Sequence, residues 1–148
     1  MRAVVTGGAG YIGSALVASL LEMGYSVLSV DNMKTGEHRA LDGYSGNPRL
    51  KLVLADVRDR AGLVEAFRAF GNVDVLFHLA GVSGVEACDR DPEYAVGTSV
   101  LGTYNVVEAA RGLGVRRVVF SSSAAVYGVP LAVPVDEEYP LRPVNLYG

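Results

Sequence analysis

Short apolar segments rich in β-branched residues alternate along this chain with longer segments in which apolar residues recur at helical spacing. The short segments predict strands within residues 2–6, 25–30, 50–55, 73–80 and 115–123. The longer ones predict helices at residues 12–23, 63–70 and 91–111. Because strands that alternate with helices are typical of a parallel sheet, the pattern predicts an α/β protein built from βαβ units.

The last predicted helix has an unusual composition. It begins after Asp91 with proline at its first helical position, and it contains Gly97 and Gly102. Each internal glycine costs about 1 kcal/mol relative to alanine. We therefore expect this helix to pack closely against a neighbour.

Two segments lack periodicity. Residues 32–48 predict a surface loop with a short helical turn. In residues 129–148, four prolines exclude a long helix or a central strand. This second segment predicts either an ordered loop over an active site or a linker.

Composition excludes several classes of function. With 148 residues, half of them hydrophobic, the chain can form one domain with a core. A net charge of −3 with interspersed acids and bases predicts no nucleic-acid partner and no membrane association. The single Cys88 cannot form an internal disulfide, and the histidines, His38 and His78, lie far apart, so we expect no metal site and a cytoplasmic location.

The segment "VTGGAGYIGS" joins the first strand to the first helix. Gly7, Gly10 and Gly13 at this junction are typical of the turn that binds a dinucleotide pyrophosphate. Gly7 permits the tight turn, Gly10 lets phosphate oxygens approach the backbone, and Gly13 allows the helix to pack closely on the strand. A glycine-rich turn that binds no ligand stays open as the alternative on this motif alone.

Asp31 ends the second strand, where a carboxylate can accept hydrogen bonds from the hydroxyls of the adenosine ribose. The same carboxylate repels the 2′-phosphate of NADP. The sequence therefore predicts NAD as cofactor, unless Lys34 or Arg39 neutralises that phosphate.

The motifs "TGGAGYIG", "VDN", "ADVRD", "HLAG", "SSSAAVYG" and "PVNLYG", in this order, resemble the extended short-chain dehydrogenase/reductases, and among them the NAD-dependent sugar-nucleotide epimerases and dehydratases. With the βαβ pattern, this resemblance implies a doubly wound Rossmann-type sheet of strand order 3-2-1-4-5 that binds NAD at its carboxyl edge. By the same resemblance, residues 1–148 form one NAD-binding domain.

The resemblance also implies roles for individual residues. Ser123 and Tyr147 are the expected catalytic residues, and both are expected to bind substrate together with Ser83. The expected cofactor-binding residues are Gly7, Gly10, Tyr11, Ile12, Gly13, Asp31, Asn32, Asp56, Val57, Leu79, Ala80, Gly81 and Ser121.

The implied activity is epimerisation at C4 of a UDP-sugar through a transient 4-keto sugar. Relatives form dimers through the long helices, and we expect this chain to form a dimer or larger species through either these helices or the exposed edge of the fifth strand. The lysine of the family's tyrosine-x-x-x-lysine pair and the substrate lobe fall beyond Gly148, so we expect this chain to be an inactive cofactor-binding fragment. Many relatives carry asparagine where this chain has Ser99, and many galactose epimerases carry lysine where it has Ser83. A 4,6-dehydratase, a decarboxylase, a threonine dehydrogenase-like enzyme and a non-catalytic NAD-binding module stay open as alternatives.

Overall fold

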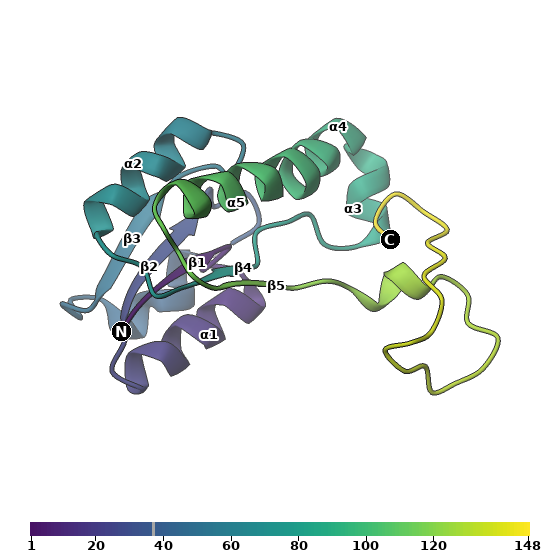
Figure 1. The fold of residues 1–148 in the computed structure, drawn as a ribbon, viewed down its shortest axis with the longest axis horizontal. Coiled ribbons are helices and arrows are strands. Elements are labelled where there is room, and N and C mark those ends of the chain that lie inside the picture. Colours follow the sequence, from purple (N-terminus) through teal and green to yellow (C-terminus); the bar gives the residue numbers. More distant parts are fainter. Residues whose placement is uncertain (37) are drawn as a thin grey trace.

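A parallel sheet forms the centre of the computed structural model, which describes residues 1–36 and 38–148 (Figure 1). Within these residues its five strands lie in the order β3-β2-β1-β4-β5. Their bounds are β1 Arg2–Thr6, β2 Ser26–Asp31, β3 Leu50–Leu54, β4 Val75–His78 and β5 Val118–Phe120. The predicted fold class and strand order are therefore confirmed.

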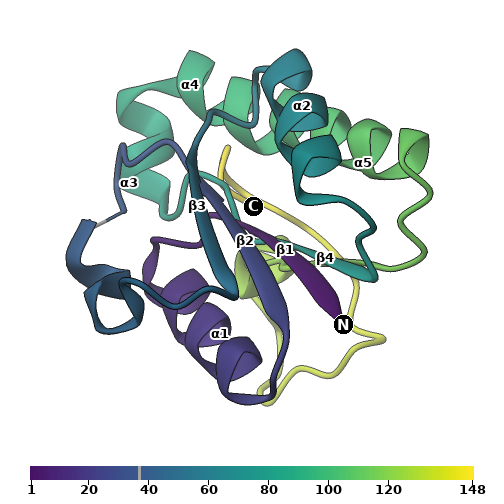
Figure 2. The same ribbon diagram turned by 90° about the vertical axis from the view of Figure 1, so that its left-hand side faces the viewer.

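Helices cover both faces of the sheet, as Figures 1 and 2 show together. The helix α1, Tyr11–Glu22, lies on one face, and α2, Arg60–Phe70, lies with α5, Gly102–Gly112, on the other. The remaining helical elements are the 3₁₀ helices η1 His38–Tyr44 and η3 Ala124–Tyr127, the short helices α3 Val85–Arg90 and α4 Pro92–Val96, and the π-helical turn η2 Gly97–Leu101. Among the described residues, none of the helices has the combined length and apolarity that a membrane span requires.

Each face of the sheet has its own core, because successive side chains of a strand point to opposite faces. Val4 of β1 packs into the cluster that contains Phe67 of α2 and Val106 of α5. Its neighbour Val5 packs with Val17 and Leu21 of α1. The sheet is thus held on both sides, and its carboxyl edge is left to the loops.

The predicted helix at residues 91–111 is present as α4, η2 and α5 in direct succession. The Asp91 carboxylate accepts a hydrogen bond from the backbone N–H of Tyr94 (3.0 Å) and so caps α4. A Cβ atom at Gly102 would lie 2.5 Å from Cγ2 of Val57, and one at Gly97 would lie 3.3 Å from Cδ of Arg58. The expected close packing at both glycines is therefore confirmed.

Two helical features differ from the sequence prediction. The helix α2 begins at Arg60 rather than at residue 63, because the Asp59 carboxylate caps it by accepting the N–H of Gly62 (3.1 Å). The helix α3 was not predicted; Cys88 is its buried residue, so its sequence has no amphipathic periodicity.

The two aperiodic segments form loops. The predicted helical turn in residues 32–48 is η1, although residue 37 lies outside the described residues. Residues 129–148 contain no helix or strand in the described structure. They fold back on η3, where the N–H of Arg142 donates to the carbonyl of Val126 (2.9 Å).

Candidate functional site

The loop between β1 and α1 lies at the carboxyl edge of the sheet, and packing explains two of its three spaced glycines. Gly7 has a φ of 73°, and a Cβ there would lie 2.7 Å from the backbone nitrogen of Ala80. A Cβ at Gly13 would overlap the carbonyl oxygen of Gly7. Glycine is therefore required at both positions for the βα turn to close.

Gly10 has a different environment. Its φ of −75° and ψ of 174° are accessible to any residue, and a Cβ would meet only the Gly7 carbonyl oxygen, at 3.2 Å. Intramolecular packing thus constrains Gly10 less than it constrains Gly7 and Gly13, although 3.2 Å is a tight approach to a backbone oxygen. A backbone without a Cβ is what a phosphate oxygen needs for close approach.

Gly10 also caps α1, and no side chain caps this helix within the described structure. The first turn carries no acidic residue, and Tyr11 and Ile12 are exposed. The first N–H groups of a helix have no intrahelical partner, and the helix dipole favours an anion near them. This end of α1 is therefore suited to bind a pyrophosphate.

Asp31 lies at the end of β2 and organises the loop around it. Its carboxylate accepts hydrogen bonds from the N–H of Ala9 (3.0 Å) and from the N–H of Met33 (2.9 Å). The first bond joins β2 to the glycine loop. Asp31 thus has a positioning role that the sequence motif did not reveal.

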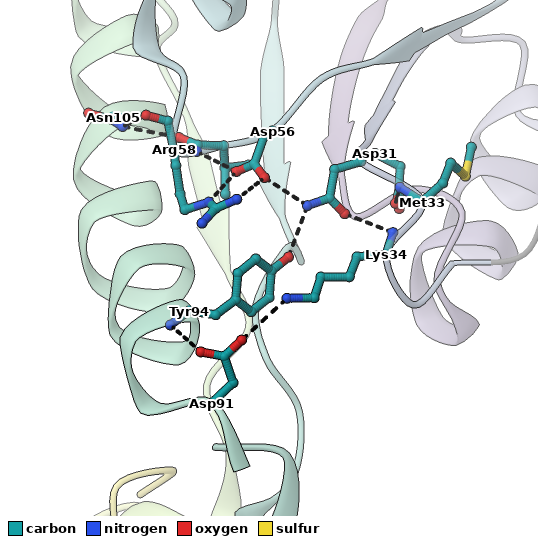
Figure 3. Close-up of polar contacts among 10 residues, drawn as sticks. Asp31, Met33, Lys34, Asp56, Arg58, Asp91, Tyr94 and Asn105 are labelled. Atoms are coloured by element: carbon teal, nitrogen blue, oxygen red, sulfur yellow. Dashed lines mark hydrogen bonds and ion pairs between the residues drawn. The ribbon is translucent and has the colours of Figure 1, made fainter. Parts of the chain in front are cut away.

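Asn32 and Asp56, on the loops after β2 and β3, belong to one polar network (Figure 3). The amide of Asn32 donates to Asp56 (2.9 Å) and to the hydroxyl of Tyr94 (2.9 Å). The Arg58 guanidinium donates to both carboxylate oxygens of Asp56, at 3.0 and 2.8 Å, and holds the pKa of Asp56 well below its usual range. Asp56 is therefore an anion with fixed partners.

Sequence reasoning missed Arg58 and Tyr94 as members of this network. Arg58 follows Asp56 by two residues, a spacing at which its own N–H also donates to that carboxylate (2.9 Å). That local signal was available in the sequence. Tyr94 comes from α4, and only the fold brings it to Asn32.

Val57 is almost fully buried beneath α5. The amide of Asn105 donates to the carbonyl oxygens of Val57 (3.1 Å) and Arg58 (3.0 Å). The loop after β3 is thereby fixed against the long helix.

The loop after β4 holds three further predicted residues, and two of them, Leu79 and Ala80, lie against the glycine turn. The N–H of Leu79 donates to the carbonyl of Thr6 (3.0 Å), and the backbone of Ala80 lies against Gly7. Gly81 follows, close to Ser99, whose hydroxyl accepts the N–H of Val82 (3.3 Å).

The remaining predicted residues lie farther along the same edge. Ser83 is exposed on the loop before α3, and the N–H of Ser121 donates to the carbonyl of His78 (3.4 Å). The hydroxyl of Ser123 accepts the N–H of Ala125 (3.2 Å). Tyr147 precedes Gly148, whose backbone packs against Ala125, but no hydrogen bond joins Tyr147 to Ser123 in the described part of the chain.

Comparison with known proteins agrees with this geometry. A family model described as "NAD dependent epimerase/dehydratase family" matches residues 3–148. The chain belongs to this family. The resemblance carried by the sequence motifs is thereby confirmed.

Curated and solved members of the epimerase/dehydratase family are similar over nearly the whole chain. A UDP-glucose 4-epimerase of Mycolicibacterium smegmatis is 39% identical over 150 residues, which cover 99% of this chain and 47% of that protein. The structure of Thermus thermophilus UDP-glucose 4-epimerase in complex with NAD has a TM-score of 0.89 and 36% identity, covering 99% of this chain and 46% of that one. The structure of Bifidobacterium longum UDP-glucose 4-epimerase in complex with NAD⁺ and UDP has a TM-score of 0.90 and 34% identity, covering 99% of this chain and 44% of that one. This chain therefore spans about half the length of the relatives that it matches.

Proposed function

We propose that this chain binds NAD at the carboxyl edge of its sheet and is the cofactor-binding part of a UDP-glucose 4-epimerase. The observation that carries the proposal is the backbone at Gly10, which has no side chain and begins α1 without a side-chain cap, next to a loop anchored by Asp31. A Cβ at Gly10 would occupy the place of a phosphate oxygen, so the residues fit a dinucleotide. NAD in the Thermus thermophilus and Bifidobacterium longum structures supports the assignment.

In this proposal the cofactor extends across the loops that follow the strands. Gly7, Gly10, Tyr11, Ile12 and Gly13 surround the pyrophosphate. The adenosine side is lined by Asp31, Asn32, Asp56 and Val57, and the opposite side by Leu79, Ala80, Gly81 and Ser121. Ser83, Ser123 and Tyr147 are proposed to contact a UDP-sugar.

The proposed reaction inverts C4 of the sugar through a transient 4-keto sugar. Bound NAD supplies the chemistry that accepts and returns the hydride. Tyr147 takes the proton of the 4-hydroxyl and gives it back when the 4-keto sugar is reduced, and the Ser123 hydroxyl orients that oxygen. Ala124 and Ala125 follow the serine where a 4,6-dehydratase needs acidic residues, which favours the epimerase over that alternative.

We also propose a cytoplasmic homodimer. The long helix exposes several large apolar residues that suit a helix-to-helix interface: Val96, Val100, Leu101, Tyr104 and Val107. The single Cys88 is buried and free, which suits a reducing compartment.

Cofactor titration tests the binding part of this proposal. We expect the wild-type chain to bind NAD more tightly than NADP in calorimetry. Asp31→Ala should weaken NAD binding by about tenfold or more, because a hydrogen bond between a ribose hydroxyl and a charged group is lost. The affinity for NADP should fall less, so the preference for NAD over NADP should become smaller. Equal affinities of the wild-type chain for the two cofactors would contradict the assigned role of Asp31.

Turnover tests the catalytic part. We expect this chain alone to interconvert UDP-glucose and UDP-galactose at a rate near background. Fusion to the C-terminal half of the Mycolicibacterium smegmatis relative should produce turnover, because that half supplies the substrate lobe. Tyr147→Phe in the fusion should remove the activity while leaving NAD affinity intact. Full activity of the Tyr147→Phe fusion would show that this tyrosine is not the base.

A further inference from the structure

The ammonium group of Lys34 is held on the side of the loop where α4 lies (Figure 3). Its Nζ atom lies 3.1 Å from the centroid of the Tyr94 ring and 3.6 Å from a carboxylate oxygen of Asp91. An aromatic face and a carboxylate both attract a cation. Lys34 is therefore directed toward these two residues.

The two groups that hold Lys34 are themselves fixed. The hydroxyl of Tyr94 accepts a hydrogen bond from Asn32, and the Arg58 guanidinium carbon lies 4.6 Å from the centroid of its ring. Asp91 caps α4 through its other carboxylate oxygen. The site that holds Lys34 is thus formed by Tyr94 of α4 and by the N-cap residue Asp91.

This placement matters because Lys34 follows Asp31 by only three residues. A 2′-phosphate on the adenosine ribose would come close to the Asp31 carboxylate, and a nearby cation would be needed to offset the repulsion. Lys34 lies on the loop after β2, from which it could offset this repulsion, but its ammonium group is directed to Asp91 and Tyr94. Arg58 is likewise occupied, by both carboxylate oxygens of Asp56.

We propose that Tyr94 and Asp91 determine cofactor specificity by holding Lys34 away from the ribose 2′ position, which keeps this cation from offsetting the charge of Asp31 and disfavours NADP. The inference rests on the proposed binding of NAD and adds the residues that set its selectivity. The side chains of Lys34 and Asp91 are 48% and 53% exposed, so solvent weakens their attraction. A moderate change in selectivity, about tenfold, is therefore expected from releasing Lys34.

The test compares the ratio of the NAD and NADP dissociation constants among variants of the chain by calorimetry. Asp91→Asn removes the charge and keeps a capping side chain for α4. Tyr94→Leu removes the aromatic face. Each variant should shift the ratio toward NADP by several-fold, and the double variant should shift it by about tenfold. Effects that both cofactors share, such as a displaced Asn32, cancel in the ratio.

Two further variants identify the group responsible. Tyr94→Phe loses the hydrogen bond from Asn32 but keeps the ring under Lys34, so its ratio should match the wild type. Adding Lys34→Ala to the double variant should abolish the shift toward NADP.

An unchanged ratio in a double variant that still binds NAD would overturn the inference and leave the proposed function intact. A shift that persists without Lys34 would also overturn it, because another cation, such as Arg39, would then be responsible. If the wild-type chain binds neither cofactor, the proposed function fails, and the inference fails with it.

Discussion

Gly10→Val should lower the affinity of this chain for NAD by about a hundredfold or more, because a steric cost of about 3 kcal/mol corresponds to that factor. The valine side chain would fill the space in front of the loop that a pyrophosphate needs. The fold should survive with a small loss of stability, since the Gly10 backbone is in an extended conformation and a Cβ would need only a small shift of the Gly7 carbonyl oxygen, which lies 3.2 Å away. Calorimetric titration measures the affinity, and circular dichroism with thermal melting checks the fold.

The matched control is Gly13→Ala. Here the added Cβ would overlap the Gly7 carbonyl oxygen, so α1 must move away from β1. We expect a loss of about 1 to 3 kcal/mol in the free energy of unfolding. Wild-type affinity in Gly10→Val would mean that the loop is only a turn, the alternative that the glycine motif alone leaves open.

Lowering the pH from about 7 to about 4.5 should destabilise the fold by roughly 2 to 3 kcal/mol through His78 alone. His78 is 1% exposed, at the end of β4, and burial lowers its pKa to about 4 from the ordinary 6.5. Since the unfolded chain binds the proton more tightly than the native state, the stability is fully present above pH 6.5. It is lost progressively as the pH falls toward 4.

Hydrogen bonds identify the neutral form of this ring. The Thr103 hydroxyl donates to the carbonyl of Ser99 (2.6 Å), so it can only accept from Nε2 of His78 (2.9 Å). The proton of the neutral ring is therefore on Nε2, and Nδ1 accepts a hydrogen bond from the hydroxyl of Thr6 (2.7 Å). A second proton on the ring would remove this acceptor and place a charge in the core.

Urea denaturation at several pH values measures the effect, and His78→Gln is the control. The glutamine variant should be less stable near neutral pH, because it cannot make both hydrogen bonds, but its stability should change less between pH 6.5 and 4. The pKa of Asp56 is lower than usual in the fold, so this carboxyl changes the free energy of unfolding at more acidic pH, below this range. Equal pH dependence in wild type and variant would show that His78 does not titrate as assigned.

The sequence determined most of the fold of this chain because most of its elements have a local cause. Val4 and Val5 point to different cores, and α1 has one apolar face. Hydrophobic burial produces these patterns in any strand covered on both faces and in any helix packed on a sheet. The strand order follows from the βαβ connections and the motif resemblance, and it is confirmed. Helix α3 escaped prediction because a short helix with one buried residue produces no periodicity.

At the site, sequence motifs determined which backbone segments meet at the carboxyl edge, because parallel strands bring their ends together. The sequence roles assigned to Asp31, Asn32 and Asp56 stay predictions until cofactor binding is measured. Only the tertiary structure distinguished Gly10, where a Cβ would meet one backbone oxygen at 3.2 Å, from Gly7 and Gly13, where it would lie within 2.9 Å of several backbone atoms. Only the tertiary structure brought Tyr94 of α4 and the N-cap residue Asp91 to Lys34. Such contacts join residues that are far apart in the chain. Spacing along the sequence cannot predict them, because they form only when the helices pack on the sheet.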